Sequence, residues 1–361
     1  MVKSVYIHIP FCKQKCLYCD FNSFQNKEVL IDDYMKALYK ECAKFSFSEL
    51  ETIYIGGGTP SFIDSKYIVE LLKMLPNAKE ITVEMNPCTV TKEKLMDYKN
   101  AGVNRISMGL QTTNDDILKT IGRVHTFEEF KKAYELVKEA GFENVNVDLM
   151  FGLPTQTIKD VEESLRYLIS INPTHISCYS LILHADIFKN LPSDDDEREM
   201  YYLTQKLLKQ AGYEQYEISN FSKVGYESMH NLAYWNQEEY VGLGAGASSY
   251  VNGKRYTNEA NIEMYISKID VGDEIKNIEE VQDEEDKLKE YVILRLRLVD
   301  GVSINKVEEK FGVDLIKKFE KEIERLHKLE LVEICEKYNE NFLRLTKKGM
   351  DFANQVWQEF I

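Results

Sequence analysis

The chain has 361 residues, of which 44% are hydrophobic and 29% are charged, with 18 glycines and 7 prolines. This composition excludes collagen-like, low-complexity and wholly disordered chains, and the length predicts about two domains. The net charge of −15 disfavours binding to the nucleic-acid backbone or to an anionic membrane surface, so we expect a small ligand and no nucleic acid.

No stretch of the sequence reaches the roughly 20 apolar residues of a membrane helix, and the first residues lack the apolar core of a signal peptide. We therefore expect a cytoplasmic protein without a transmembrane segment. Cysteines are odd in number, at 7, and three of them crowd into one short segment. In a reducing compartment this crowding favours metal ligation over a disulfide framework.

Short apolar segments rich in Val, Ile and Tyr alternate with segments of helical periodicity in the first half of the chain. The predicted strands are 5–9, 52–58, 81–87, 105–111, 146–152 and 175–181. The predicted helices between them are 32–44, 66–75, 92–101, 127–140 and 158–171. This alternation predicts a parallel sheet, either doubly wound or an incomplete barrel. Unusual residues end nearly every strand, as they do around one barrel mouth, so the predicted fold is α/β, a partial (β/α)6 TIM-like barrel.

The rest of the chain predicts a helix and two further units. Ser193 is a predicted N-cap of a helix that ends near Gln210. The predicted domains are a partial barrel over 1–212, a strand-rich extension over 213–280, and a C-terminal helical, winged-helix-like domain over 281–361. The charge of 301–361 is near neutral, which favours a packing or lid module over a DNA-binding one.

Cys12, Cys16 and Cys19 form a CxxxCxxC motif directly after the first predicted strand. Three thiolates on one loop can hold three irons of a [4Fe–4S] cluster and leave the fourth iron open for another ligand. The alternatives are a zinc site that lacks its fourth ligand, or chance crowding. This spacing is unusual for a zinc knuckle and no second cysteine pair follows, so the motif predicts an iron–sulfur cluster.

The cysteine motif resembles that of the radical S-adenosylmethionine superfamily. Within it, the segment YIHIPFC at 6–12 resembles the branch of oxygen-independent coproporphyrinogen III oxidases and HemW-type haem chaperones, over essentially the whole chain. The resemblance implies that S-adenosylmethionine binds the open iron and that one electron from the cluster cleaves its sulfonium. The protein's task is then to place this cofactor and to keep water from the radical.

Residues at the other strand ends fit this cofactor. The turn containing Gly57, Gly58 and Thr59 lets backbone approach the methionyl amine, because glycine has no Cβ, although such a sequence is by itself equally a tight turn. Taken singly, the polar residues that follow are more often surface or capping residues, and the tyrosines core residues. By resemblance, the contacts are Glu84 and Gln111 to the methionine and ribose end, Arg123 to the carboxylate, Asp148 to the ribose region, Tyr6 to the sulfonium, and Tyr18 beside the cluster.

Two features separate the branches of this family. The oxidase has another cysteine two residues after the third one, where this chain has Phe21. The oxidase also has an N-terminal extension, whereas few residues precede Tyr6 in this sequence. Both differences disfavour coproporphyrinogen decarboxylation, and the Cys19-Asp20-Phe21 sequence resembles the HemW-type branch.

A second motif, HNLAYW at 230–235, matches the HNxxYW motif that is implicated in haem binding in HemW-type proteins. His230 offers an axial iron ligand, while Tyr234 and Trp235 can stack on a porphyrin. The alternative is a hydrogen-bonded structural histidine and a core tryptophan. The glycine-rich segment 242–246 lacks the following helix and acidic partner of a dinucleotide site, so we predict no Rossmann site there.

The resemblance as a whole implies a haem chaperone that binds haem, a [4Fe–4S] cluster and S-adenosylmethionine. Its expected partners are haem, a haem-accepting protein such as a membrane-bound respiratory enzyme, and a second copy of the chain in a homodimer. The competing hypothesis is an oxygen-independent coproporphyrinogen III oxidase. The weakest alternative is a cluster protein with a structural or interaction role.

Overall fold

The structure, a computed structural model, describes residues 2–182 and 187–361. Its strands are β1 (Ser4–Ile9), β2 (Thr52–Gly57), β3 (Glu80–Met85), β4 (Arg105–Gln111), β5 (Asn144–Phe151), β6 (His175–Ser180), β7 (Glu214–Glu217), β8 (Asn220–Ser222), β9 (Tyr240–Leu243), β10 (Ser248–Val251), β11 (Lys254–Asn258), β12 (Lys276–Val281), β13 (Val302–Ser303), β14 (Val332–Lys337) and β15 (Glu340–Leu345). Its α-helices are α1 (Ile31–Cys42), α2 (Ser65–Lys73), α3 (Lys92–Asn100), α4 (Asp115–Thr120), α5 (Phe127–Glu139), α6 (Ile158–Ile171), α7 (Asp194–Gln210), α8 (Met229–Trp235), α9 (Ile262–Val271), α10 (Glu284–Arg295), α11 (Ile304–Phe311), α12 (Leu315–Lys318), α13 (Glu320–Lys328), α14 (Lys347–Asp351) and α15 (Ala353–Gln358).

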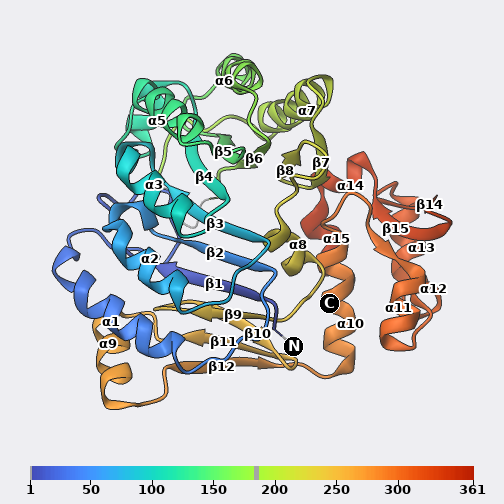
Figure 1. Cartoon of the computed structure of the whole chain (residues 1–361). Coiled ribbons are helices and arrows are strands. Elements are labelled where there is room, and N and C mark those ends of the chain that lie inside the picture. The colour runs from blue at the N-terminus through green and yellow to red at the C-terminus, as the bar shows by residue number, and fades with distance from the viewer. Residues whose placement is uncertain (1, 183–186) are drawn as a thin grey trace.

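One open sheet organises the molecule, with the strand order β12-β11-β10-β9-β1-β2-β3-β4-β5-β6-β8-β7. Every pairing from β9 through β1 to β6 is parallel. Figure 1 shows α1, α2, α3, α5 and α6 along one side of these strands. The predicted α/β class with a parallel sheet is confirmed. The sheet is open, since its end strands β12 and β7 do not pair with each other among the described residues, and an open parallel sheet is compatible with the predicted partial barrel.

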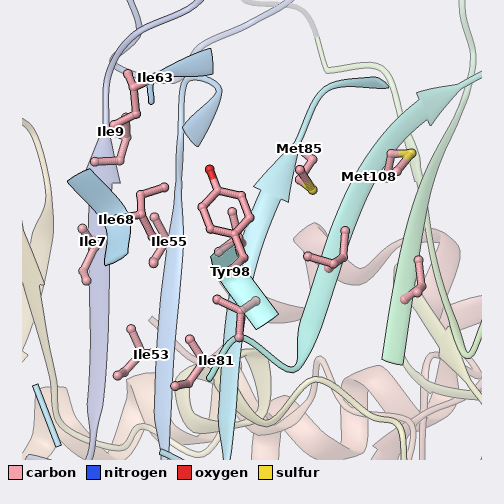
Figure 2. Close-up of a cluster of buried hydrophobic side chains, with 14 of the residues drawn as sticks. Ile7, Ile9, Ile53, Ile55, Ile63, Ile68, Ile81, Met85, Tyr98 and Met108 are labelled. Atoms are coloured by element: carbon pink, nitrogen blue, oxygen red, sulfur yellow. The ribbon is translucent and has the colours of Figure 1, made fainter. Parts of the chain in front are cut away.

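The apolar core lies between the parallel strands and the helices, because successive strand side chains point to opposite faces. Figure 2 shows Ile7 and Ile9 of β1 near Ile53 and Ile55 of β2 in this core. Each of these side chains is at most 1% exposed. The alternate positions face the other side of the sheet and are mostly polar, and they include Tyr6, His8, Tyr54, Glu84, Arg105 and Asp148. The candidate site is built on that polar face.

Helix α7 begins at the predicted N-cap. Ser193 Oγ accepts a hydrogen bond from the backbone N–H of Asp196 at 3.2 Å, and the Asp196 carboxylate accepts from the backbone N–H of Ser193 at 3.3 Å. This reciprocal pair satisfies two backbone donors that have no partner within the helix.

The segment 213–280 joins both edges of the main sheet. Strands β7 and β8 lie beyond β6, whereas β9 pairs with β1 and leads through β10 and β11 to β12. The HNLAYW segment lies in the short helix α8, although we predicted strand-like structure around it. Its N-cap, Ser228, has a side chain that accepts from the N–H of Asn231 at 3.4 Å. The glycine-rich segment 242–246 connects β9 to antiparallel β10, which is not the strand-to-helix geometry of a dinucleotide site.

The C-terminal residues form a second core. Val292, Leu326 and Leu343 are buried together, and the small sheet β13-β15-β14 packs with α11 to α13. This arrangement matches the predicted winged-helix-like unit, with the two-residue strand β13 in addition. The division of the chain at residues 212 and 280 stays a prediction. No described helix combines the length and apolar character that a membrane crossing needs.

Candidate functional site

The cysteine loop follows β1 and folds back on itself. Pro10 O accepts from the N–H of Phe24 at 2.7 Å, and Phe24 O accepts from the N–H of Cys12 at 2.9 Å. These two bonds close the loop that carries all three cysteines of the motif. Cys12 is buried, Cys16 and Cys19 are partly exposed, and all three thiols are free.

Each cysteine sulfur has its own polar neighbour. Thr59 Oγ1 lies 3.6 Å from the sulfur of Cys12, and Ser23 Oγ lies 3.7 Å from that of Cys19. Arg123 Nη1 donates to the sulfur of Cys16 at 3.6 Å. In the described residues no three His, Cys, Asp or Glu side chains are placed to share one metal ion. Three cysteine thiols on one loop are donors of the kind that hold an iron–sulfur cluster, in which each cysteine binds a different iron.

The three sulfurs open onto a cavity of about 310 Å³ at the carboxyl ends of the parallel strands. The cavity gathers most of the residues that the sequence assigned to the cluster and its cofactor. The predicted residues that line it are Cys12, Cys16, Tyr18, Cys19, Gly57, Gly58, Thr59, Glu84, Gln111, Arg123 and Asp148.

The glycine turn after β2 brings backbone close to the cysteine loop. Gly57 has a φ of +113°, and a Cβ at this position would lie 2.6 Å from Cε1 of His8. A Cβ on Gly58 would lie 3.0 Å from the sulfur of Cys12. Only glycine allows this approach, so the turn presents bare backbone beside the cluster loop.

Two partly buried carboxyl groups, those of Glu84 and Asp148, face the cavity. Glu84 accepts from Tyr54 OH at 2.7 Å and from the N–H of Gly57 at 3.3 Å, and burial raises the pKa of Glu84 to about 7. Asp148 accepts from Asn146 Nδ2 at 2.7 Å, and burial likewise raises the pKa of Asp148. Because burial penalises the ionised carboxylates, a ligand that brings positive charge or hydroxyl donors would stabilise them.

Arg123 and Gln111 also line the cavity. Arg123 Nη2 donates to Gly109 O at 2.8 Å, while its buried Nε has no hydrogen-bond partner among the described residues. Gln111 has a φ of +72° at an irregularity in the β4–β5 pairing, and such a conformation is uncommon for a residue with a side chain. Backbone of this kind persists where the surrounding structure holds it, often at binding sites.

Four predicted residues lie outside this cavity, namely Tyr6, His230, Tyr234 and Trp235. Tyr6 hydrogen-bonds to Nδ1 of His8 at 2.9 Å. His230 is 1% exposed, with Nδ1 bonded to Thr52 Oγ1 at 2.7 Å and Nε2 to Tyr234 OH at 2.8 Å. Burial lowers the pKa of His230 to about 3, so its ring is neutral. Both ring nitrogens are therefore engaged within the chain.

Helix α8 nevertheless contacts the cavity through another residue of its motif. Asn231 lines the cavity, whereas Tyr234 and Trp235 line a separate pocket of about 210 Å³. The Arg297 guanidinium lies over the Trp235 ring, 4.5 Å from its centroid. The motif thus lies between the cavity beside the cysteines and the C-terminal part of the chain.

Sequence reasoning missed several residues on the cavity wall. Tyr54, Arg105, Tyr179 and Asn231 line it beside the predicted residues. Tyr179 OH donates to Gln111 Oε1 at 3.4 Å. Tyr54, Arg105 and Tyr179 lie on strands, where they alternate with buried apolar residues. This alternation could have identified them, because it places their side chains on the polar face of the sheet.

Comparison with known proteins agrees with this geometry. Residues 6–168 match the model of the radical SAM superfamily, and residues 282–352 match that of the HemN C-terminal domain. The chain is 39% identical to the heme chaperone HemW of Bacillus subtilis, over 100% of this chain and 99% of that protein. The chain belongs to the HemW family. The Lactococcus lactis member is 37% identical over 99% of this chain and 97% of its own.

The solved structures show the fold that HemW proteins share with a related enzyme. The coproporphyrinogen III oxidase HemN of Escherichia coli superposes with a TM-score of 0.87, covering 99% of this chain and 90% of that one. The sequence identity of this pair is 22%. The likeness therefore shows a common architecture and does not transfer the oxidase reaction.

Proposed function

We propose that this protein is a haem chaperone that binds haem, a [4Fe–4S] cluster and S-adenosylmethionine and delivers haem to an acceptor protein in the cytoplasm. The observation that carries the proposal is the convergence of three free thiols, a glycine turn and two partly buried carboxyl groups on one cavity, in a chain of the HemW family. The names of the curated relatives support haem as the cargo. The acceptor is a haem protein such as a membrane-bound respiratory enzyme.

In this proposal the three motif cysteines hold three irons, and the remaining iron binds the cofactor. When bound, the cluster and S-adenosylmethionine together supply one-electron radical chemistry. The chain's own residues bind and orient the cofactor. The carboxylate of Glu84 would accept from the methionyl ammonium, the unpartnered Nε of Arg123 would donate to the methionyl carboxylate, and Asp148 would accept from ribose hydroxyls.

The role of His230 as an iron ligand stays a prediction. To reach haem iron its ring would have to give up the bond to Tyr234 OH or the bond to Thr52 Oγ1. Titrating haem into wild type and His230→Ala tests this role. An unchanged affinity and Soret spectrum would remove His230 as a ligand and leave the chaperone proposal in place.

The decisive experiment is a haem titration of the anaerobically reconstituted full chain. We expect a shifted Soret band that saturates with haem, together with iron and sulfide contents that fit one [4Fe–4S] cluster. Failure to bind haem would overturn the proposal. Incubation with S-adenosylmethionine, a reductant and coproporphyrinogen III tests the competing function, because formation of protoporphyrinogen would assign the protein to the oxidases instead.

A further inference from the structure

A second cavity lies where the end of the parallel sheet meets the C-terminal module. It measures about 780 Å³, more than twice the volume of the cavity around the cysteines. The end of β6 and the start of α7 form one wall, and α14 and α15 form the other. Figure 1 shows α14 and α15 on the side of the main sheet where β7 and β8 lie. We call this cavity the C-terminal cleft.

The walls of the C-terminal cleft combine apolar area with charged side chains of both signs. Its aromatic and thioether side chains are Phe151, Tyr179, Tyr201, Met350, Phe352 and Trp357. Its cationic side chains are Arg198 and Arg297, and its acidic side chains are Asp194, Glu197 and Asp351. The volume is in the range of roughly 300–1,000 Å³ that is typical of small-molecule sites. A flat apolar ring with carboxylates at one edge can stack on the aromatic side chains, and its carboxylates can pair with an arginine that gives up an acidic partner.

The two arginines are held by different contacts. Arg198 is 39% exposed at the side chain, and it donates to Asp195 at 2.8 Å and lies 3.8 Å from Asp351. Arg297 donates from Nε to the fully buried Glu217 at 2.9 Å. Arg198 can therefore exchange an exposed partner for a ligand carboxylate, whereas Arg297 is fixed in place.

Unsatisfied polar atoms also mark the C-terminal cleft. Among the described residues, the buried Nε1 of Trp357 and the buried Oδ1 of Asp351 have no hydrogen-bond partner. Both residues line the cleft. Buried polar atoms without partners are uncommon in folded proteins, and a bound ligand or an ordered water is one way to satisfy them.

The C-terminal cleft adjoins the cofactor cavity and the HNxxYW motif. Tyr179 and Ser219 line both cavities. The Arg297 guanidinium contacts two tryptophan rings, at 4.5 Å from the Trp235 centroid and 5.7 Å from the Trp357 centroid. Trp235 of the motif therefore positions an arginine of the cleft, even though it does not line the cleft itself.

We infer that haem binds in the C-terminal cleft, with its ring against the aromatic wall and a propionate on Arg198, and that the motif supports this site through Trp235 and Arg297. This inference rests on the proposed function, since that function supplies haem as the ligand. In this arrangement the HNxxYW motif supports haem binding even if His230 does not ligate the iron. Trp235 is then a positioning residue.

The test compares two matched arginines in the reconstituted full-length protein. Arg198 and Arg166 both lie on helices and both pair with a nearby acid on the same helix, Arg166 with Glu162 at 2.6 Å, but Arg166 does not line the cleft. We expect Arg198→Glu to weaken haem binding at least about tenfold, because it removes a charge-assisted contact and adds a repulsive carboxylate. Arg166→Glu should bind haem as wild type does.

Haem dimethyl ester, which has no free propionates, separates charge pairing from loss of structure. Wild type should bind haem at least about fivefold more tightly than the ester, since only haem offers carboxylates to Arg198. Arg198→Glu should bind the ester as wild type does. Equal haem affinity of the Arg198→Glu and Arg166→Glu variants would overturn the cleft assignment while leaving haem binding intact. A wild type that binds no haem would instead overturn the proposed function and the cleft assignment with it.

Trp235 provides the second arm of the test. Trp235→Leu should weaken haem binding several-fold, because it removes the aromatic face under Arg297, and Trp235→Phe should restore much of the affinity. S-adenosylmethionine affinity, measured in the same variants, should not change. Haem binding that is unaffected in Trp235→Leu would refute the link between the motif and the cleft.

Discussion

The raised pKa of Glu84 gives a prediction about stability and pH. Glu84 is partly buried, and desolvation raises its pKa to about 7 in the folded chain, compared with an ordinary value of 4.5. At 1.36 kcal/mol for each pH unit, this difference disfavours the ionised form in the fold by about 3 kcal/mol. The folded state holds the proton more tightly than the unfolded state. The contribution of the protonated Glu84 side chain to the free energy of unfolding is therefore complete below pH 4.5, and it is lost as the pH rises through about 7.

The perturbation that tests this reasoning is Glu84→Gln, which keeps the shape and a hydrogen-bonding group near Tyr54 but cannot ionise. Urea unfolding of both proteins without S-adenosylmethionine gives their free energies of unfolding. Relative to wild type, the variant should gain about 3 kcal/mol between pH 4.5 and pH 8, with most of the gain by pH 7. Comparing the two proteins cancels other titrating groups. A difference that stays constant across this range would refute the assignment of a raised pKa to Glu84.

Three further substitutions probe the cluster loop, the glycine turn and the buried acid Glu41. Cys16→Ala should lose the cluster absorbance and most of the iron, whereas Cys335→Ala, in β14, should keep both; a cluster retained in the first variant would contradict the ligand assignment. Gly57→Ala should lower the affinity for S-adenosylmethionine at least about tenfold, because the positive φ of Gly57 and the nearby His8 ring leave no room for a Cβ. Equilibrium dialysis measures this affinity, and a wild-type value would contradict the prediction. Glu41→Ala should lower the free energy of unfolding by about 3 kcal/mol or more, since Glu41 accepts three buried hydrogen bonds, and an unchanged urea midpoint would show that these bonds contribute little.

The sequence predicted the elements whose signals are local. All six parallel strands of the barrel appear within a few residues of their predicted bounds, because buried apolar runs flanked by helical periods identify them directly. The cysteine loop was equally predictable, since its three thiols are close in sequence. The parallel pairing of β9 with β1 was not, because residues far apart in the chain meet there and leave no local pattern.

Residues of the candidate site could be predicted from the sequence where they belong to a recognisable motif. They could not be predicted where only their position on one face of a strand brings them to the cavity. Glu84 and Asp148 were assigned from the resemblance, and both line the cavity. Arg105 and Tyr179 line the same cavity but carry no motif. Their contribution follows only from the face of the strand on which they lie. Helix α8 was missed because its seven residues are too few for a clear helical period.

The electrostatics of the polar face indicate the charge of the ligand that it favours. Arg105 is buried, lies 3.9 Å from Glu80, and lowers the pKa of both Glu84 and Asp148, but burial outweighs it and raises both values. The cavity therefore holds carboxyl groups whose ionised forms the protein alone does not fully compensate. A ligand with an ammonium group and a sulfonium would supply the missing positive charge, and in the proposed function its carboxylate would accept a hydrogen bond from the unpartnered Nε of Arg123. The other face of the same strands, which packs against the helices, is apolar and stabilises the fold. Because side chains alternate between the two faces along each strand, the residues that would bind the ligand and the residues that form the core lie on opposite faces.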